Sequence, residues 1–440
     1  DTAPAAGPSV AVGSEPTGLA LTPNNTKLYV SNWVDGTLSV IDPETMMLSS
    51  TIDLNAALAG TNLLGPVQPR AALAHPRAIA ITNNGDDKDA DEHVYVTEWF
   101  AARTGPEEVN TADTNRKGFV YKINVLESTV QLIDLPPVMN TGFNDHNDTP
   151  TGCFPNQVGS ITILGNYAYV SSTCASPKGP LGVFAGKNPG SACTVPTEKA
   201  DCGALGGTCN ANTLKCNPNP TDVKTTTHPA LTSINLMDNT AKTEVLDKRF
   251  SDAMSGRMPL LPTDLGFVAG QFGYLTAMGA DAVFRLDIKD GVINGVGSQT
   301  NKFINLHKDA NDKLIRLPIG IAIAQSKAFG FVVNEVSRDV TALAFNTQII
   351  AGNGVDDFKI AQSSPLPAAD SPEDKVLKGK RFFVTGIGRW SLNGEAWGSC
   401  AACHIDGLSD NITWYFARGP RQSTSLDGSF ASKDSNDQRI

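Results

Sequence analysis

A pattern of short apolar strands separated by tight turns recurs along the first 362 residues of this 440-residue chain. The first copy, residues 8–54, contains four strands, and its turns are rich in Pro, Asn, Asp and Gly, as hairpin turns are. Four more copies open at Pro76, Val158, Thr263 and Pro318. Repeated β units of this kind predict an all-β propeller with five or more blades over residues 1–362. A β-sandwich with extra strands is the alternative.

The first copy also resembles a known repeat family. Residues 28–32 read Leu-Tyr-Val-Ser-Asn, and residues 39–43 read Ser-Val-Ile-Asp-Pro. This combination is similar to the Tyr-Val-Thr-Asn family of β-propeller repeats. The resemblance implies the fold that the periodicity predicts.

The third copy contains a long insertion, at about residues 175–228, rich in Pro, Gly, Lys and Thr. Six cysteines lie in or beside it: Cys153, Cys174, Cys193, Cys202, Cys209 and Cys216. An even number of cysteines in such a context indicates disulfides and an oxidising compartment. We expect Cys153 to pair with Cys174, while the other four allow three pairings. Metal binding by residues 193–216 is the alternative.

Residues 400–404 read Cys-Ala-Ala-Cys-His. Two thiols three positions apart can add to the two vinyl groups of a heme, and the adjacent imidazole then faces the iron. We therefore expect one covalent heme c, with Cys400 and Cys403 as thioether anchors and His404 as the proximal ligand. A thioredoxin-like redox pair has no use for the histidine. Half of a zinc site would need further ligands, and no Cys or His follows His404.

The flanks of this pentad add a family signal. Residues 371–374, Ser-Pro-Glu-Asp, are a typical helix start, and apolar residues continue at helical spacing to Phe383, past Gly379. After the pentad come Asp-Gly at 406–407, and an Arg at 421 that leads through small polar residues to Leu426. Residues 373–440 thus resemble the first heme domain of the bacterial diheme cytochrome c peroxidase and MauG-like family. The resemblance implies a small α-helical cytochrome c-type domain after a linker at residues 363–372, and a chemistry that uses two hemes.

Other residues near the pentad are candidates for contact with the heme. Arg418 and Arg421 could pair with the propionates, although an ordinary surface ion pair explains them equally well. Trp397, Trp414 and Phe416 are expected to form walls of the heme pocket, with core packing elsewhere as the alternative.

The sixth ligand of the iron is left open by the sequence. No Met or His lies between His404 and Ile440. The position is therefore open or water-bound, or it is filled from elsewhere. A ligand from elsewhere could be a propeller methionine, a residue of a segment missing from these 440 residues, or a residue of a neighbouring chain. The propeller methionines nearest in sequence are Met254, Met258 and Met278. Tyr415 and Lys433 are weaker local candidates, because each must lose a proton to bind iron well.

An acidic loop is a second candidate site. It contains Asp86, Asp87, Asp89 and Asp91, whose hard oxygen atoms suit calcium. The spacing does not match an EF-hand, so a solvated hairpin loop is the favoured interpretation. The remaining histidines are expected to be structural or solvated; they are His75, His93, His146, His228 and His307.

Composition restricts the class and the compartment. The net charge is −10 and there is no basic stripe, so nucleic acid is not an expected partner. No apolar run reaches the roughly 20 residues of a membrane helix. Residues 1–7 look like a mature end left by cleavage of a signal peptide. Covalent heme and disulfides together predict a periplasmic or extracellular bacterial protein.

The favoured function is electron transfer, with the propeller as a docking or assembly scaffold and no catalytic residues. The expected partner is a redox protein or another cytochrome, and a homo-oligomer is compatible with the sequence. The alternative is a peroxidase- or MauG-like enzyme whose second heme lies outside these 440 residues, since we expect residue 440 not to be the native C-terminus. A third interpretation makes the propeller a ligand-binding module and the heme a sensor.

Overall fold

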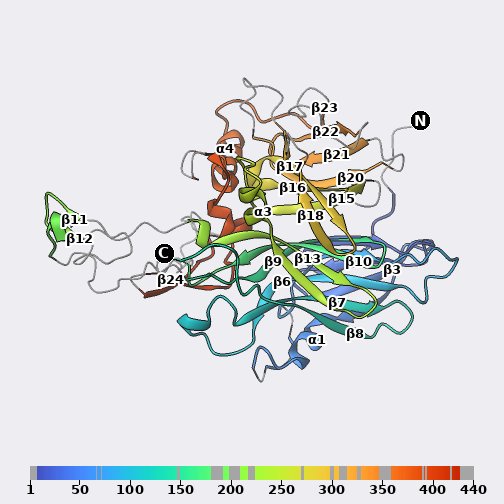
Figure 1. Ribbon diagram of the computed structural model, residues 1–440. Helices are drawn as coiled ribbons and strands as arrows, with labels where there is room; N and C mark the ends of the chain where they lie inside the picture. The colour runs from blue at the N-terminus through green and yellow to red at the C-terminus, as the bar shows by residue number, and fades with distance from the viewer. Residues whose placement is uncertain are drawn as a thin grey trace, which may run out of the picture.

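The computed structural model describes residues 7–65, 67–70, 72–145, 149–179, 192–197, 209–216, 223–268, 272–297, 302–306, 315–324, 329–345, 358–388, 391, 394–416 and 419–426. Five antiparallel sheets follow one another along the chain, and the first strand of each contacts the first strand of the next (Figure 1). This arrangement confirms the predicted all-β propeller, with five blades in the described residues.

Blades 1 and 2 are regular four-stranded sheets in which strands pair in sequence order. Blade 1 consists of β1 (Pro16–Leu21), β2 (Leu28–Asn32), β3 (Thr37–Asp42) and β4 (Met47–Asp53). Blade 2, which follows helix α1 (Leu54–Gly60), consists of β5 (Pro76–Ile81), β6 (His93–Arg103), β7 (Arg116–Asn124) and β8 (Val130–Leu135). Gly36 has a φ of +66° in the turn before β3, where a Cβ would lie 2.2 Å from the Asn55 amide oxygen. The Asp-Gly turn therefore requires its glycine.

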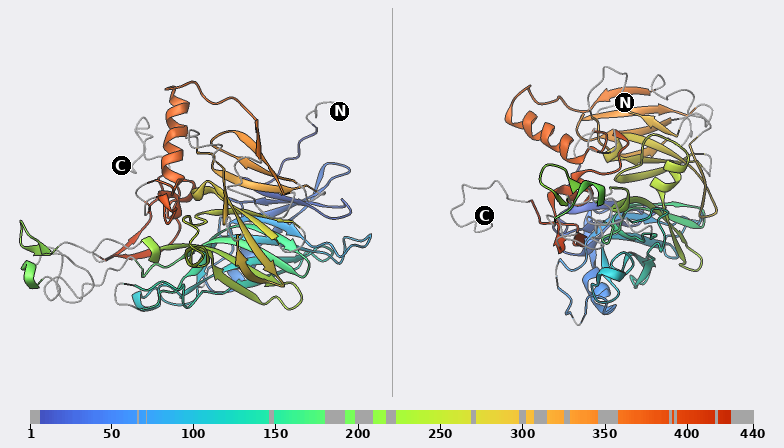
Figure 2. Two further views of the ribbon diagram at one scale, coloured as in Figure 1. Left: turned by 45° about the horizontal axis from the view of Figure 1, so that its top comes forward. Right: turned by 60° about the vertical axis from the view of Figure 1, so that its left-hand side comes forward.

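Blade 3 is interrupted by the cysteine-rich insertion. Its strands are β9 (Phe154–Leu164), β10 (Tyr167–Ala175), β13 (Thr227–Asn235) and β14 (Ala241–Val245). The insertion leaves the blade between β10 and β13, as predicted, and contains the small hairpin of β11 (Cys209–Asn210) and β12 (Lys215–Cys216). Figure 2 shows this hairpin well away from the blades.

Blades 4 and 5 complete the described sheets. Blade 4, after helix α3 (Leu246–Asp252), consists of β15 (Pro262–Val268), β16 (Phe272–Ala277), β17 (Ala282–Lys289), β18 (Val292–Val296) and a short added strand, β19 (Phe303–Asn305). Blade 5 consists of β20 (Pro318–Ile323), β21 (Phe329–Asn334), β22 (Asp339–Ala344) and β23 (Phe358–Gln362).

Consecutive blades are joined by separate apolar cores. Tyr29 and Leu38 of blade 1 pack with Val94 of blade 2 in the first core. Comparable clusters join blades 2 and 3, blades 3 and 4, and blades 4 and 5. The cluster between blades 3 and 4 also includes Trp33, from the turn after β2 of blade 1, and Leu317 and Val336, which flank strands of blade 5. Each sheet therefore packs on the next sheet in the chain, and one of the cores also collects residues from the first and the last blade.

Both sequence expectations about disulfides that fall on described residues are met. Cys153 and Cys174 are bonded, as predicted, and Cys193 is bonded to Cys209, which is one of the three pairings left open. Cys202 lies outside the described residues. The two disulfides are compatible with a secreted or periplasmic protein.

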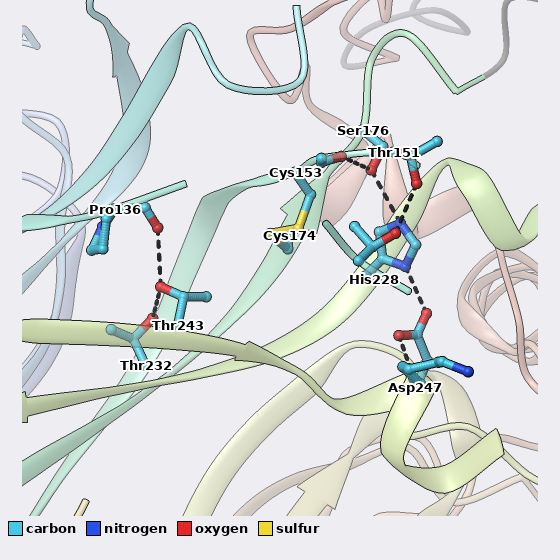
Figure 3. Close-up of a disulfide and its surroundings, with 12 residues drawn as sticks. Pro136, Thr151, Cys153, Cys174, Ser176, His228, Thr232, Thr243 and Asp247 are labelled. Carbon is cyan, nitrogen blue, oxygen red and sulfur yellow. Dashed lines mark hydrogen bonds and ion pairs between the residues drawn. A yellow bond between two sulfur atoms is a disulfide. The ribbon is translucent and has the colours of Figure 1, made fainter. Parts of the chain in front are cut away.

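The root of the insertion is closed by a buried polar cluster beside the first disulfide (Figure 3). His228 Nδ1 lies 2.8 Å from Asp247 Oδ2, and His228 Nε2 lies 3.1 Å from Ser176 Oγ. Ser176 donates to the Gly152 carbonyl, and all three side chains are fully buried. This Ser-His-Asp group has no access for a substrate, so it joins β10, β13 and α3 as a structural clamp.

The C-terminal segment does not form a distinct α-helical domain in the described residues. Helix α4 (Pro372–Val384) is followed by two one-turn 3₁₀ helices and the hairpin of β24 (Thr413–Phe416) and β25 (Gly419–Gln422). Glycines let this segment follow the propeller closely: a Cβ on Gly386 would lie 2.4 Å from Leu260 Cδ2. The segment therefore packs onto the propeller instead of forming its own helical core. None of the described helices is long and apolar enough to cross a membrane.

Candidate functional site

The Cys-x-x-Cys-His segment lies against the propeller with one side buried. Residues 400–402 form a 3₁₀ turn, and the His404 amide donates to the Cys400 carbonyl at 3.0 Å. Ala401, Ala402 and Ile405 are buried in the same apolar cluster as propeller residues between blades 3 and 4. Cys400 is exposed, and Cys403 and His404 are partly exposed. The apolar residues of the pentad thus dock the turn, and its chemical groups remain on the outer side.

His404 is held in one orientation by a backbone carbonyl. Its Nδ1 lies 3.0 Å from the Thr424 oxygen. A carbonyl can only accept, so Nδ1 must carry the proton, which leaves Nε2 with a lone pair when the ring is neutral. Histidines that bind metal commonly have this arrangement, because the hydrogen bond fixes both the tautomer and the ring orientation. The His404 imidazole therefore fits the role of an axial ligand through Nε2.

Cys400 and Cys403 are free thiols in the described structure, whereas Cys153, Cys174, Cys193 and Cys209 are paired. Cys403 packs against Ile412, Trp414 and Phe416, together with residues of blades 2 and 3. Burial, with the nearby negative charge of Asp410, raises the pKa of the Cys403 thiol to about 12. Cys403 is therefore an un-ionised thiol in this folded state at neutral pH.

Asp410 organises the loop that follows the pentad. Its carboxylate is buried and accepts from the Trp414 indole N–H at 2.7 Å, from the Ile412 amide at 3.1 Å and from the Ser423 hydroxyl. Burial raises the pKa of Asp410, and these hydrogen bonds oppose that effect. The network holds the Trp414 ring against Cys403.

Blades 2 and 3 anchor the segment by side chains that sequence reasoning did not single out. Gln157 Nε2 donates to the Ala402 carbonyl at 3.2 Å, and Asn156 Nδ2 donates to the Asp410 carbonyl at 3.0 Å. Arg77 forms an ion pair with Asp406 at 3.3 Å. Gln157 has a φ of +52°, unusual for a residue with a Cβ, at an irregularity of β9. The sequence signal for these two anchoring contacts is the pair of polar residues Asn156 and Gln157 near the start of β9.

A cavity of about 550 Å³ lies between α4 and the pentad. It is lined mainly by apolar residues, among them Val376, Gly379, Phe383, Ile405, Leu426 and Met278. A Cβ on Gly379 would meet no atom within 4 Å, so the helix surface here is uncovered. Of the three propeller methionines considered as iron ligands, only Met278 lines this cavity; Met258 is buried in the core, and Met254 is 90% exposed.

A second cavity, of about 350 Å³, opens at the centre of the propeller beneath Ile405 and Asp406. The first strands of all five blades contribute to it, through Thr17, Arg77, Gln157, Thr263 and Ile319. The pentad therefore sits beside the mouth of the central channel, where α4 and the following segment lie in Figure 2.

Several predicted contact residues lie elsewhere. Trp397 is buried in the propeller core: its indole N–H donates to Glu395 at 2.9 Å, and Phe143 meets its ring edge-on at 5.6 Å. The alternative of core packing therefore describes Trp397 better. Arg421 is on the exposed β25, where its guanidinium donates to the Pro420 carbonyl. Arg418 and Lys433 lie outside the described residues, and the backbone amide of Tyr415 donates to Pro177.

The acidic loop is a junction between blades. Asp89 is buried, and its carboxylate accepts from the backbone and side chains of Asn24 and Thr26 in blade 1. Burial would raise the pKa of Asp89, but the hydrogen bonds outweigh it and lower the pKa to about 2. Asp91 accepts from Asn84, while Asp86 and Asp87 are exposed. Within the described ranges, no group of three or more His, Cys, Asp or Glu is placed to hold a metal.

A buried carboxylate in β6 was also not predicted. Glu98 accepts from the Tyr121 hydroxyl at 2.7 Å and from the His75 amide at 2.9 Å. Burial raises the pKa of Glu98 to about 7 despite these hydrogen bonds. Burial also lowers the pKa of His75 to about 4, which agrees with the expectation that His75 is structural. His93 and His228 are likewise within blades, and His146 and His307 lie outside the described residues.

Comparison with known proteins finds fold likeness alone. No family model and no curated protein matches this chain. Among solved structures, hydrazine synthase of Kuenenia stuttgartiensis is 13% identical, with 76% of this chain and 73% of that chain covered and a TM-score of 0.43. Virginiamycin B lyase of Staphylococcus aureus is 11% identical (81% and 71% covered, TM-score 0.38). The periplasmic gluconolactonase of Pseudomonas aeruginosa is 14% identical (82% and 77% covered, TM-score 0.39). These likenesses say nothing of the chemistry of this chain.

Proposed function

We propose that this protein is a secreted bacterial c-type cytochrome that transfers electrons through one covalent heme, with the propeller as its docking scaffold. The observation that carries the proposal is the state of the pentad. His404 has Nδ1 committed to the Thr424 carbonyl, and Cys400 and Cys403 stay unpaired in a chain that forms disulfides elsewhere. Together they supply an oriented imidazole and two thiols, which is the donor set of heme c.

Each residue has a role toward the heme under this proposal. Cys400 and Cys403 hold it by thioether bonds, and His404 binds the iron through Nε2. Trp414 and Phe416 form an apolar wall beside Cys403, and Arg421 remains a candidate for a propionate. Bound heme supplies a reversible one-electron couple, and an apolar wall favours the reduced state because the oxidised heme carries more charge.

Heme attachment is tested by replacing both thiols. In the Cys400→Ala/Cys403→Ala variant we expect no heme to survive hot detergent, while the far-ultraviolet circular dichroism of the blades is unchanged. Cys153→Ala/Cys174→Ala is the matched control, since it also removes two cysteines but should keep covalent heme. Covalent heme in the first variant would refute the thioether assignment.

The sixth ligand separates electron transfer from the runner-up, a peroxidase- or MauG-like enzyme that uses a second heme outside residues 1–440. The position of Met278 on the cavity beside the pentad supports it as a ligand from the propeller. We expect a low-spin ferric electron paramagnetic resonance signal that becomes high-spin in Met278→Ala. A high-spin signal in the unaltered protein would indicate an open site and favour the peroxidase alternative.

A further inference from the structure

The cavity at the centre of the propeller is bordered by charges of both signs. Two cations and two carboxylates are among the described residues that line it: Arg77, Lys380, Asp406 and Glu335. They form two ion pairs, Arg77 with Asp406 and Lys380 with Glu335, and each pair joins a blade to the C-terminal segment. The lining is therefore neutral overall, although both signs of charge face the same small volume.

The Arg77 guanidinium is held in place but keeps hydrogen-bond donors uncommitted. Its Cζ lies 4.4 Å from the centre of the Trp99 ring and 5.3 Å from that of Trp33, both within the range of a cation–π contact. A guanidinium has several N–H donors, and among the described residues the side chain of Arg77 donates to Asp406 alone, at 3.3 Å. The remaining donors form a fork of the kind that pairs with a carboxylate.

Gln157 supplies a buried acceptor to the lining of the same cavity. The residue is 5% exposed, and its Nε2 is committed to the Ala402 carbonyl. Its Oε1 has no hydrogen-bond partner in the part of the chain that the structure describes. A buried oxygen without a donor is unfavourable, so a ligand that brings an N–H group to Gln157 gains free energy.

Apolar side chains form another part of the wall. Leu261 and Ile319 come from the starts of blades 4 and 5, and Ile405 comes from the turn after the pentad. Arg77 and Gln157 come from the first strands of blades 2 and 3. A cavity of about 350 Å³ with these groups suits a small molecule that combines charged groups with an aliphatic group.

We propose that the central cavity binds a small zwitterion, namely an α-amino acid with an aliphatic side chain. Its carboxylate accepts from the uncommitted donors of Arg77, and its ammonium group donates to Gln157 Oε1. An anion without the ammonium group would meet the carboxylates of Asp406 and Glu335 uncompensated, and a simple cation would meet Arg77 and Lys380 in the same way. A zwitterion keeps the neutral cavity neutral. This inference does not depend on the proposed heme.

Isothermal titration calorimetry of the purified 440-residue protein tests the site, with L-leucine as the probe. Two analogues have the same aliphatic part: 4-methylpentanoate lacks the ammonium group, and 3-methylbutylamine lacks the carboxylate. We expect saturable binding of L-leucine and an affinity about tenfold or more lower for either analogue, because each loses a charge-assisted hydrogen bond. L-Leucine should also raise the melting temperature, since it binds the folded state.

Arg77→Met keeps an apolar stem but removes the guanidinium, and we expect it to weaken L-leucine binding by about tenfold or more. Arg103→Met is the matched control, since Arg103 is 56% exposed, pairs with Glu107 and does not line the cavity; it should bind L-leucine normally. If Arg77→Met does not fold, the comparison of the three ligands on the unaltered protein still decides.

Three results would overturn the proposal. The first is the absence of saturable heat with L-leucine. The second is equal affinity for L-leucine and 4-methylpentanoate, which would make the cavity a site for simple carboxylates. The third is unchanged L-leucine binding by a folded Arg77→Met variant, which would place the ligand elsewhere on the molecule.

Discussion

Replacement of Asp89 by Asn tests whether the acidic loop is a structural junction or a metal site. The carboxylate of Asp89 accepts from the backbone and side chains of both Asn24 and Thr26 across the blade 1–blade 2 boundary. An amide keeps one acceptor oxygen but turns an N–H₂ group toward donors on the other side. We therefore expect Asp89→Asn to destabilise the protein.

The magnitude follows from the pKa of Asp89. A folded-state pKa of about 2 against the ordinary 3.8 corresponds to roughly 2 kcal/mol of stabilisation by the ionised form. Because the loop borders solvent, screening reduces this, and we expect a loss of about 1–2 kcal/mol. The pKa is lowered by folding, so the contribution is complete above pH 4 and disappears as the pH falls through about 2.

Urea unfolding at pH 7 and at pH 2 measures this effect, with Asp87→Asn as the control from the same loop. Asp87 is exposed, so its replacement should be neutral at both pH values. The interpretation of this loop as a structural junction is wrong if Asp89→Asn behaves like Asp87→Asn at pH 7. It is also wrong if calcium raises the unfolding midpoint of the unaltered protein but not that of Asp89→Asn, because the loop would then be a calcium site.

Three further predictions concern the buried polar groups and the first disulfide. Folding raises the pKa of Glu98 to about 7, so its protonated form stabilises the fold at low pH. The free energy of unfolding should therefore fall as the pH rises from about 4.5 to 7. Glu98→Gln should flatten that pH dependence in urea titrations. His228→Leu should cost about 3 kcal/mol in the same assay, because it leaves Asp247 buried without its partner; a loss below 1 kcal/mol would contradict the clamp. Cys153→Ala/Cys174→Ala should cost about 3 kcal/mol, as expected for closing a loop of 21 residues, and an unchanged midpoint would show that the bridge is dispensable.

The sequence predicted features that depend on local chemistry. Repeated hairpin turns located the five sheets, and Ser371 with Pro372 located the start of α4, where the Ser371 hydroxyl accepts from the Asp374 amide at 3.2 Å. The Cys153–Cys174 bridge was also predictable. It joins the residue directly before β9 to a residue of β10, the strand that pairs with β9. Each of these signals lies within a few residues of the element that it specifies.

The position of the pentad on the propeller was not predictable in this way. It depends on contacts such as Gln157 to Ala402 and Asn156 to Asp410, which span 245 and 254 residues. Polar residues at the start of a strand do not indicate what they will meet at such distances. The aromatic residues show the same limit: Trp414 lies beside Cys403, whereas Trp397 points into the propeller core.

The burial of Ala401, Ala402 and Ile405 bears on when a cofactor could reach the two thiols. In the docked state Cys403 packs against Trp414 and Phe416, and burial raises the pKa of its thiol to about 12, which disfavours the nucleophilic thiolate. We therefore expect attachment of the proposed heme to be faster before the turn docks onto the blades. A propeller that folds completely before the cofactor arrives should then react with it more slowly at Cys403 than at the exposed Cys400.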